Sequence, residues 1–175
     1  MPIRLGGSEA LQARWLPEID DGKLMCGFAM TEMDAGSDVG AMTTRATRDN
    51  GQWVLEGRKS FISNAGIADV YTVFASTDPK AGAKGISAFV VDAATPGIDI
   101  GRPEEKLGLR ASVTAAVSFS GCRVPSRQLL GTEGAGFKIA LATLDHSRLG
   151  IAAQAVGMHQ RALELATAYA SERVQ

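Results

Sequence analysis

The C-terminal part of the chain carries one long helical repeat, and this repeat limits the folds open to it. Apolar or small residues recur at helical spacing from Phe137 to Tyr169, and no proline interrupts them. A helix this long and rich in alanine is not stable alone and must pack in a bundle. We therefore expect residues 134–175 to begin a helical domain whose other helices lie in further residues or in other chains. The stripe consists of Phe137, Leu141, Leu144, Ile151, Ala155, Met158, Ala162, Ala166 and Tyr169.

Arg148 interrupts this stripe at a position where the repeat requires an apolar side chain. Asp145 lies three residues earlier and therefore on the same side of the helix. The two residues form either an intrahelical ion pair or a charged group kept for a ligand. Periodicity alone favours the ion pair.

Residues 24–133 show the pattern of β structure. Asp49-Asn50-Gly51 predicts a hairpin between two strands, and Glu56-Gly57 predicts a further turn. Short strands at this spacing, without helices between them, favour a barrel or a sandwich over a parallel α/β sheet. The expected strands cover residues 24–31, 43–47, 53–55, 60–62, 69–76, 85–91 and 113–119.

Residues 1–23 are expected to contain a short amphipathic helix. Ser8 is suited to cap its N-terminus ahead of Leu11, and Pro17 is expected to end or kink it. The chain thus divides into three segments, and the fold class is α+β. A helical segment precedes a central antiparallel β domain, and a long helix follows it.

Charge and cysteine content exclude several classes of function. The chain holds 18 Lys and Arg against 19 Asp and Glu, so it lacks the basic footprint of a nucleic-acid binder. Cys26 and Cys122 match no zinc or redox motif, and we expect no metal site and two buried, reduced thiols. No run approaches the roughly 20 apolar residues of a membrane helix, and the N-terminus lacks an apolar signal region. We therefore expect a cytoplasmic protein.

The segment from Phe28 to Asp38 holds the residues best suited to contact a ligand. A strand runs into a loop of small residues, which lets backbone amides approach a ligand closely. Thr31 and Ser37 add hydroxyls that both donate and accept hydrogen bonds. The segment is neither a Walker nor a Rossmann motif. Taken alone, it is better interpreted as a turn with local hydrogen bonds.

This segment also resembles the flavin- and CoA-contacting segment of the acyl-CoA dehydrogenases, and further blocks resemble that family in the expected order. The resemblance covers nearly the whole chain from about Gly7, leans toward short-chain, butyryl-type members and implies that the chain is the central portion of such an enzyme. The blocks are FAMTEMDAGSD (28–38), GRKSFISNA (57–65), KGISAFVV (84–91), TPGI (95–98), KLGLRAS (106–112), VP (124–125), LGTEGAGF (130–137) and LDHSR (144–148).

The resemblance implies a middle, barrel-like β domain between two helical domains. Residues 1–23 would end the first helical domain, and residues 134–175 would open the second. It also implies FAD as cofactor, an α,β-dehydrogenation of acyl-CoA thioesters in fatty acid β-oxidation, an electron-transfer flavoprotein as acceptor and a homotetramer in the intact protein.

The resemblance assigns ligand contacts residue by residue. Thr31 would hydrogen-bond the pyrimidine edge of the flavin, Phe61 would lie near its ring system, and Ser63 would reach toward N5. Such contacts tune the electron affinity of a flavin. The implied flavin residues are Phe28, Met30, Thr31, Phe61, Ile62 and Ser63. The implied acyl-CoA residues are Ser37, Asp145, His146, Ser147 and Arg148.

The chain departs from the family at two positions that matter for chemistry. Met33 stands where the family usually has proline, so the loop is expected to be less rigid. Ser147 stands where a minority of members carry the catalytic Glu, and most members carry it beyond residue 175. No catalytic residue is therefore expected here, and Glu32 and Asp38 are interpreted as solvated or turn-stabilising carboxylates. Two alternatives stay open: a non-catalytic flavin- or CoA-binding module, and a flavin monooxygenase or nitroalkane oxidase on the same scaffold.

Overall fold

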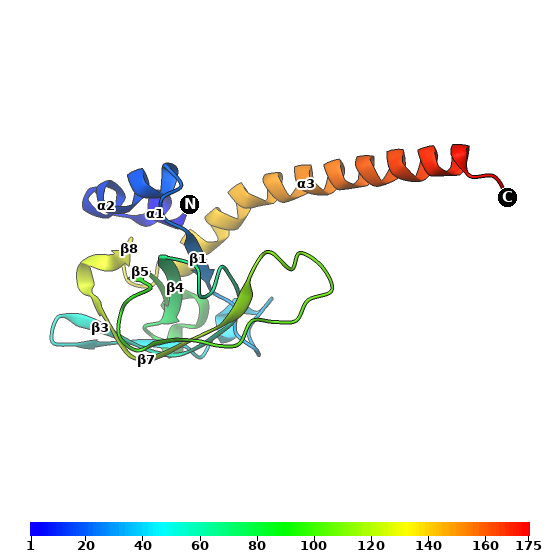
Figure 1. Ribbon diagram of the computed structural model, residues 1–175. Helices are drawn as coiled ribbons and strands as arrows, with labels where there is room; N and C mark the ends of the chain where they lie inside the picture. Colours follow the sequence, from blue (N-terminus) through cyan, green and yellow to red (C-terminus); the bar gives the residue numbers. More distant parts are fainter. The chain divides into compact units, whose positions relative to one another are not determined.

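A computed structural model describes all residues from Met1 to Gln175 (Figure 1). The chain divides into two compact units, Met1–Ala140 and Leu141–Gln175. None of its helices is both long and apolar enough to cross a membrane. The elements are α1 (Pro2–Gly6), α2 (Glu9–Asp20), β1 (Cys26–Ala29), η1 (Val39–Ala41), β2 (Arg45–Asp49), β3 (Gln52–Ser63), β4 (Val70–Ser76), η2 (Pro79–Gly85), β5 (Ile86–Asp92), β6 (Ile98–Ile100), β7 (Thr114–Pro125), η3 (Ser126–Gln128), β8 (Leu129–Leu130) and α3 (Gly136–Glu172).

One eight-stranded sheet organises the first unit. Its hydrogen-bonded order is β6-β7-β3-β2-β4-β5-β8, and β1 joins it beside β4. Most neighbours are antiparallel, but β1 and β2 each pair with β4 in parallel. The order ends at β6 and β8, and each of these pairs with one neighbour only, so the sheet is not closed into a barrel. The α+β class is confirmed; the barrel-like, antiparallel arrangement is not.

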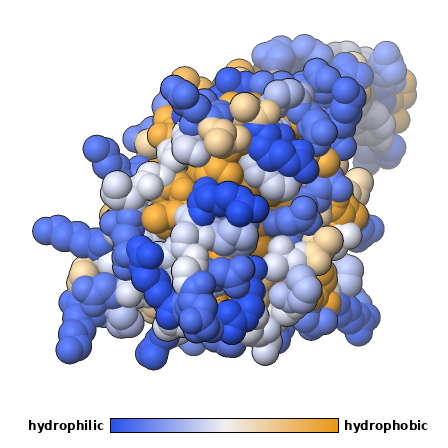
Figure 2. Space-filling view, turned by 90° about the vertical axis from the view of Figure 1, so that its left-hand side faces the viewer, coloured by the Kyte–Doolittle hydropathy of each residue, from blue (hydrophilic) through white to orange (hydrophobic).

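Two hydrophobic clusters lie on opposite faces of β4 and β5, because alternate residues of a strand point to opposite sides. Val73 and Phe89 belong to a cluster with Trp53 and other side chains of β3 and β7. Phe74 belongs to the second cluster, together with Trp15 of α2. Figure 1 shows α1 and α2 on one side of these strands. The face drawn in Figure 2 is largely hydrophilic, with smaller areas of apolar surface between the polar side chains.

Strand β3 runs unbroken for 12 residues, where the sequence predicted two strands and a turn at Glu56-Gly57. That prediction was wrong, because the pairing with β7 shifts register between Leu55 and Gly57, which is a β-bulge. Gly57 has a φ of 142°, and a Cβ atom there would lie 2.6 Å from Thr44 Oγ1. The glycine therefore permits a close approach of two segments within a continuous strand.

The hairpin at Asp49-Asn50-Gly51 is confirmed. Residues 50 and 51 have φ values of 48° and 75°, and Asp49 pairs with Gln52 across the turn. Positive φ at both central residues matches the right-handed twist of the two strands.

The N-terminal helix α2 begins as predicted and continues past Pro17, which was expected to end or kink it. The Ser8 Oγ accepts a hydrogen bond from the Leu11 N–H at 3.3 Å. Pro17 does not end the helix, which continues to Asp20. A proline removes only one helical hydrogen bond, and the buried side chains of Leu11 and Trp15 hold the remaining turns against the sheet.

In the second unit, α3 continues as one helix to Glu172, as the repeat predicted. The apolar side chains of this unit are exposed; Ile151, for example, is 65% exposed and Met158 57%. The packing of this stripe in a bundle stays a prediction.

Candidate functional site

The end of β1 carries the first group of predicted flavin contacts. The Phe28 ring is half-buried and tilted against Phe74, with the ring centroids 4.9 Å apart. Met30 is buried in the core, so only its backbone can face a ligand. Thr31 is half-buried, and its hydroxyl makes no hydrogen bond within the chain. This hydroxyl is therefore free to donate and to accept.

The end of β3 carries the second group. Register with β7 shifts again between Lys59 and Ile62, and at this second bulge Phe61 adopts a φ of 59°. A positive φ is rare for a bulky residue and is a conformation that functional sites often hold. It turns the ring outward, where Phe61 is 52% exposed, while the Ile62 side chain is buried. The Ser63 side chain is exposed and pairs with no other group.

Two hydrogen bonds bring these two groups together. The Ser60 N–H donates to the Thr31 carbonyl oxygen at 2.8 Å. The Asn64 side-chain amide donates to the Cys26 carbonyl oxygen at 2.9 Å. Phe28 lies between the two attachment points, so the ends of β1 and β3 form a common site. The backbone segments that carry the free hydroxyl of Thr31 and the exposed ring of Phe61 are thereby joined.

A buried ion pair, which the sequence patterns did not predict, lies directly behind this site. Lys59 is fully buried and Glu32 is 5% exposed, and their charged groups are 2.9 Å apart. Glu32 had been interpreted as solvated or turn-stabilising, and the solvated interpretation was wrong. Its carboxylate accepts two hydrogen bonds from Thr43, through the N–H and the hydroxyl, and one from the Thr44 N–H. Alternation along β3 from Trp53 places residue 59 on the buried face, and this was the available signal.

Both members of the pair have shifted pKa values. Burial lowers the pKa of Lys59 to about 8, although the Glu32 carboxylate opposes this change. Burial acts to raise the pKa of Glu32, but hydrogen bonds from Lys59, Thr44 and Thr43 outweigh it and lower that pKa to about 2. Lysine and glutamate are therefore both charged at neutral pH.

The loop after Glu32 presents the predicted Ser37 to solvent. Glu32 and Ala35 exchange two backbone hydrogen bonds, of 3.0 and 3.3 Å, and close a tight turn. Met33, at the usual proline position, is 72% exposed. Ser37 follows this turn on an exposed stretch and its hydroxyl is free.

The predicted acyl-CoA residues of the second unit are four consecutive residues, which form about one turn of α3. Arg148 and Asp145 form an ion pair of 2.8 Å with both side chains about two-thirds exposed. His146 Nδ1 lies 2.7 Å from the Ala142 carbonyl oxygen, and the Ser147 hydroxyl donates to the Leu144 carbonyl oxygen at 3.0 Å. The ion pair expected from the spacing is thus present, and its exposure leaves the pair open to a ligand.

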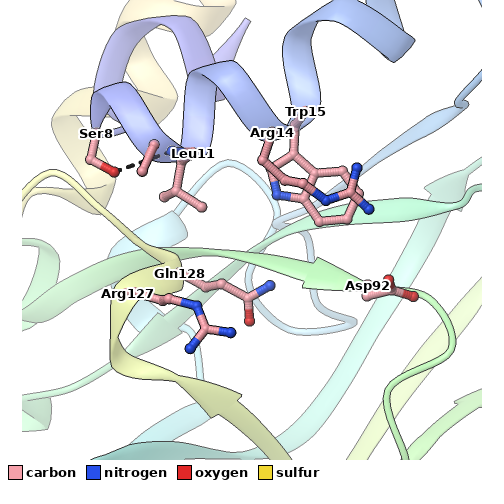
Figure 3. A pocket seen from close by; sticks show the side chains of 8 residues that line it. Ser8, Leu11, Arg14, Trp15, Asp92, Arg127 and Gln128 are labelled. Atoms are coloured by element: carbon pink, nitrogen blue, oxygen red, sulfur yellow. Dashed lines mark hydrogen bonds between the residues drawn. The ribbon is translucent and has the colours of Figure 1, made fainter.

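A separate hollow of about 340 Å³ lies between α2 and the residues around β8 (Figure 3). The Arg14 guanidinium stacks on the Trp15 ring at 4.6 Å, and Asp92, Arg127 and Gln128 line the opposite side. None of the predicted ligand residues lines this hollow.

No three His, Cys, Asp or Glu side chains gather where they could hold a metal ion. Both cysteines are free; Cys122 is buried, but Cys26 is exposed, contrary to the prediction. Gly27 and Ala29 take the buried face of β1, so the neighbouring Cys26 points away from it.

Comparison with known proteins assigns the family. The model described as "Acyl-CoA dehydrogenase, middle domain" matches residues 27–122, and "Acyl-CoA dehydrogenase, C-terminal domain" matches residues 134–175. The chain therefore belongs to the acyl-CoA dehydrogenase family, as the ordered blocks indicated.

Three relatives illustrate the similarity. An acyl-CoA dehydrogenase of Bacillus subtilis (strain 168) is 47% identical over 99% of this chain and 46% of its own length. The solved butyryl-CoA dehydrogenase of Megasphaera elsdenii has a TM-score of 0.96 at 42% identity, over 99% of this chain and 46% of that one. A chain from a study of the electron transferring flavoprotein of Acidaminococcus fermentans has a TM-score of 0.95 at 44% identity, over the same shares. The chain thus spans less than half the length of these relatives.

Proposed function

We propose that this chain supplies the flavin-contacting surface, and part of the thioester-contacting surface, of an enzyme that oxidises acyl-CoA at the α,β carbon–carbon bond. The observation that carries the proposal is the hydrogen bond of 2.8 Å between the Ser60 N–H and the Thr31 carbonyl oxygen. This bond joins the two segments on which the family places its flavin contacts.

The residues at this junction fit an isoalloxazine ring. Such a ring needs an apolar neighbour for its face and hydrogen-bonding groups for its polar edge. Phe61 provides an exposed aromatic ring in a strained backbone conformation. Thr31 and Ser63 provide hydroxyls that no other group of the chain uses. When bound, FAD would accept the two electrons that the oxidation releases.

We assign one task to each side chain. The Thr31 hydroxyl and the backbone of Phe28 and Met30 hold the pyrimidine edge, Phe61 covers the ring system, and Ser63 donates toward N5. The Ile62 side chain is buried and leaves only its backbone for the cofactor. Ser37 and the exposed group Asp145, His146, Ser147 and Arg148 contact the acyl-CoA.

We infer that the α-proton is removed by a base outside these residues, because Ser147 stands where a minority of the family carries the catalytic Glu and has no basic group. Butyryl-CoA dehydrogenase is among the similar structures, and this favours a short acyl chain. The similarity to a chain studied with an electron transferring flavoprotein favours such a protein as acceptor. We further infer that the intact protein is a homotetramer that acts in fatty acid β-oxidation.

Titration of the purified chain with FAD tests the proposal. We expect bound flavin with a shifted visible spectrum, and a changed reduction potential in Thr31→Ala and Ser63→Ala. Thr47→Ala is a suitable control, since Thr47 is an exposed residue of β2 away from the junction. Absence of flavin binding, or an unchanged potential in both variants, would refute the assignment.

A further inference from the structure

Lys59 carries its positive charge in the protein interior, and no part of its side chain is exposed. Its ammonium contacts the Met30 carbonyl oxygen at 2.9 Å, Glu32 Oε1 at 2.9 Å and Met42 Sδ at 3.8 Å. A buried ion pair is often no more stabilising than apolar residues of similar volume. Its directed hydrogen bonds, however, fix geometry in a way that apolar contacts do not.

We propose that Lys59 and Glu32 are positioning residues, which set the placement of Thr31 against Phe61 in the flavin site. This inference rests on the proposed function. It goes beyond it by naming the buried groups that hold the two contact segments in register.

Consecutive residues of β3 contact consecutive residues that follow β1. Lys59 binds the carbonyl oxygen of Met30, and the next residue, Ser60, binds that of Thr31. Two consecutive residues of β3 therefore hold two consecutive residues after β1. Phe61 comes next and turns outward at the bulge. A shift of the Lys59 contact would move the free hydroxyl and the exposed ring relative to each other.

The Glu32 carboxylate makes the second set of contacts behind the site. Glu32 Oε2 accepts from the N–H and the hydroxyl of Thr43, both at 2.7 Å, and Oε1 accepts from the Thr44 N–H at 2.9 Å. Glu32 thus fixes the point where the chain returns from the loop and enters β2 at Arg45. With Lys59 as its fourth donor, the carboxylate ties three segments together behind the site.

No other charged side chain bonds to either member of the pair. Met30 and Met42 are the remaining neighbours of the ammonium, and neither carries a charge. The Thr44 hydroxyl is buried without a hydrogen-bond partner, and Thr44 bonds to the carboxylate through its N–H. Loss of Lys59 leaves the Met30 carbonyl oxygen without its donor, and loss of the Glu32 charge leaves the ammonium uncompensated.

The test compares Lys59→Met and Glu32→Gln with Val124→Ala. Glu32→Gln keeps the volume and an acceptor oxygen, so it serves if Lys59→Met does not fold. Val124 is buried at the opposite end of the β3–β7 ladder, opposite Trp53, and controls for lost stability alone. The readouts are amide hydrogen exchange at Ser60 and Thr43 in the free chain, and the affinity and reduction potential of added FAD.

For both pair variants we expect the two amides to exchange about tenfold faster than in Val124→Ala, and FAD to bind about tenfold more weakly with a shifted potential. If the wild-type chain does not bind FAD, the proposed function fails, and the exchange rates still test the pair. Exchange rates equal to those of Val124→Ala would overturn the inference in either case. Normal flavin binding with an unchanged potential in both pair variants would overturn it and leave the proposed function intact.

Discussion

The ring of Tyr71 fills the space in which a side chain at Gly27 would stand. A Cβ atom at Gly27 would lie 2.4 Å from Tyr71 Cδ1. The two residues are partners in the parallel pairing of β1 with β4. The ring is fully buried, and its hydroxyl accepts a hydrogen bond from the Gly66 N–H at 3.1 Å. Tyr71 is thus buried and held at both ends.

Gly27→Ala is therefore expected to lower the free energy of unfolding by about 1–3 kcal/mol, because overpacking a closed site forces its neighbours apart. Urea unfolding followed by tryptophan fluorescence measures the change. Gly36→Ala is the matched control, since a Cβ atom there meets nothing within 4 Å. It should stay within about 0.5 kcal/mol of the wild type. Equal stability of the two variants would contradict this account.

Phe61 offers a test of strain held at the site. Its φ of 59° disfavours any residue with a Cβ atom, whereas glycine adopts it freely. Phe61→Ala and Phe61→Gly both remove the ring, but only the second removes the strain. We expect Phe61→Gly to be about 1 kcal/mol more stable than Phe61→Ala. Both should bind FAD more weakly than the wild type, which urea unfolding and flavin titration would show together.

The pKa of Glu32 predicts an acid dependence of stability. Its value of about 2 in the folded chain lies below the ordinary 4.5, so the folded state binds fewer protons than the unfolded state between these values. The stabilisation is complete above pH 4.5 and is lost as the pH falls toward 2, amounting to at most about 3 kcal/mol. Unfolding free energies measured from pH 6 to pH 2.5 should fall less steeply for Glu32→Gln. Parallel curves for the two proteins would exclude this role.

Much of the fold followed from residue patterns. The hairpin at residues 49–51, the Ser8 cap and the long helix α3 each depend on local chemistry that a sequence displays directly. The strand β3 did not follow, because a glycine marks both turns and bulges, and only the pairing with β7 distinguishes them. The openness of the sheet likewise depends on which distant strands pair.

The site was only partly visible in the sequence. From the resemblance, Thr31 and Phe61 could be proposed as flavin contacts, but the junction of their two segments depends on a hydrogen bond between residues far apart in the chain. The buried pair is harder still to predict, because lysine and glutamate are mostly exposed. Alternation from Trp53 and Leu55 does place Lys59 inside, but it places Phe61 inside as well. The second bulge turns the Phe61 side chain outward, and no feature of the neighbouring sequence predicts this bulge.

Mutations can distinguish a structural role of the ion pair between Arg148 and Asp145 from a role in ligand binding. The pair is exposed, and exposed pairs at this spacing stabilise a helix by only about 0.2–0.5 kcal/mol. Arg161 and Glu164 form a second pair of the same spacing, 3.3 Å apart and also exposed, outside the predicted acyl-CoA contacts. Arg148→Ala and Arg161→Ala should therefore reduce the helix content measured by circular dichroism equally and slightly.

If Arg148 contacts a CoA phosphate, the two variants should also differ in their affinity for butyryl-CoA. A charged hydrogen bond contributes enough that its loss weakens binding by about tenfold or more. We expect Arg148→Ala to bind butyryl-CoA more weakly in calorimetric titration, with Arg161→Ala unchanged. Arg148→Lys should recover only part of the affinity, because an ammonium does not offer the paired donors of a guanidinium. Equal affinities of Arg148→Ala and Arg161→Ala would leave the ion pair as the whole explanation of the interrupted stripe.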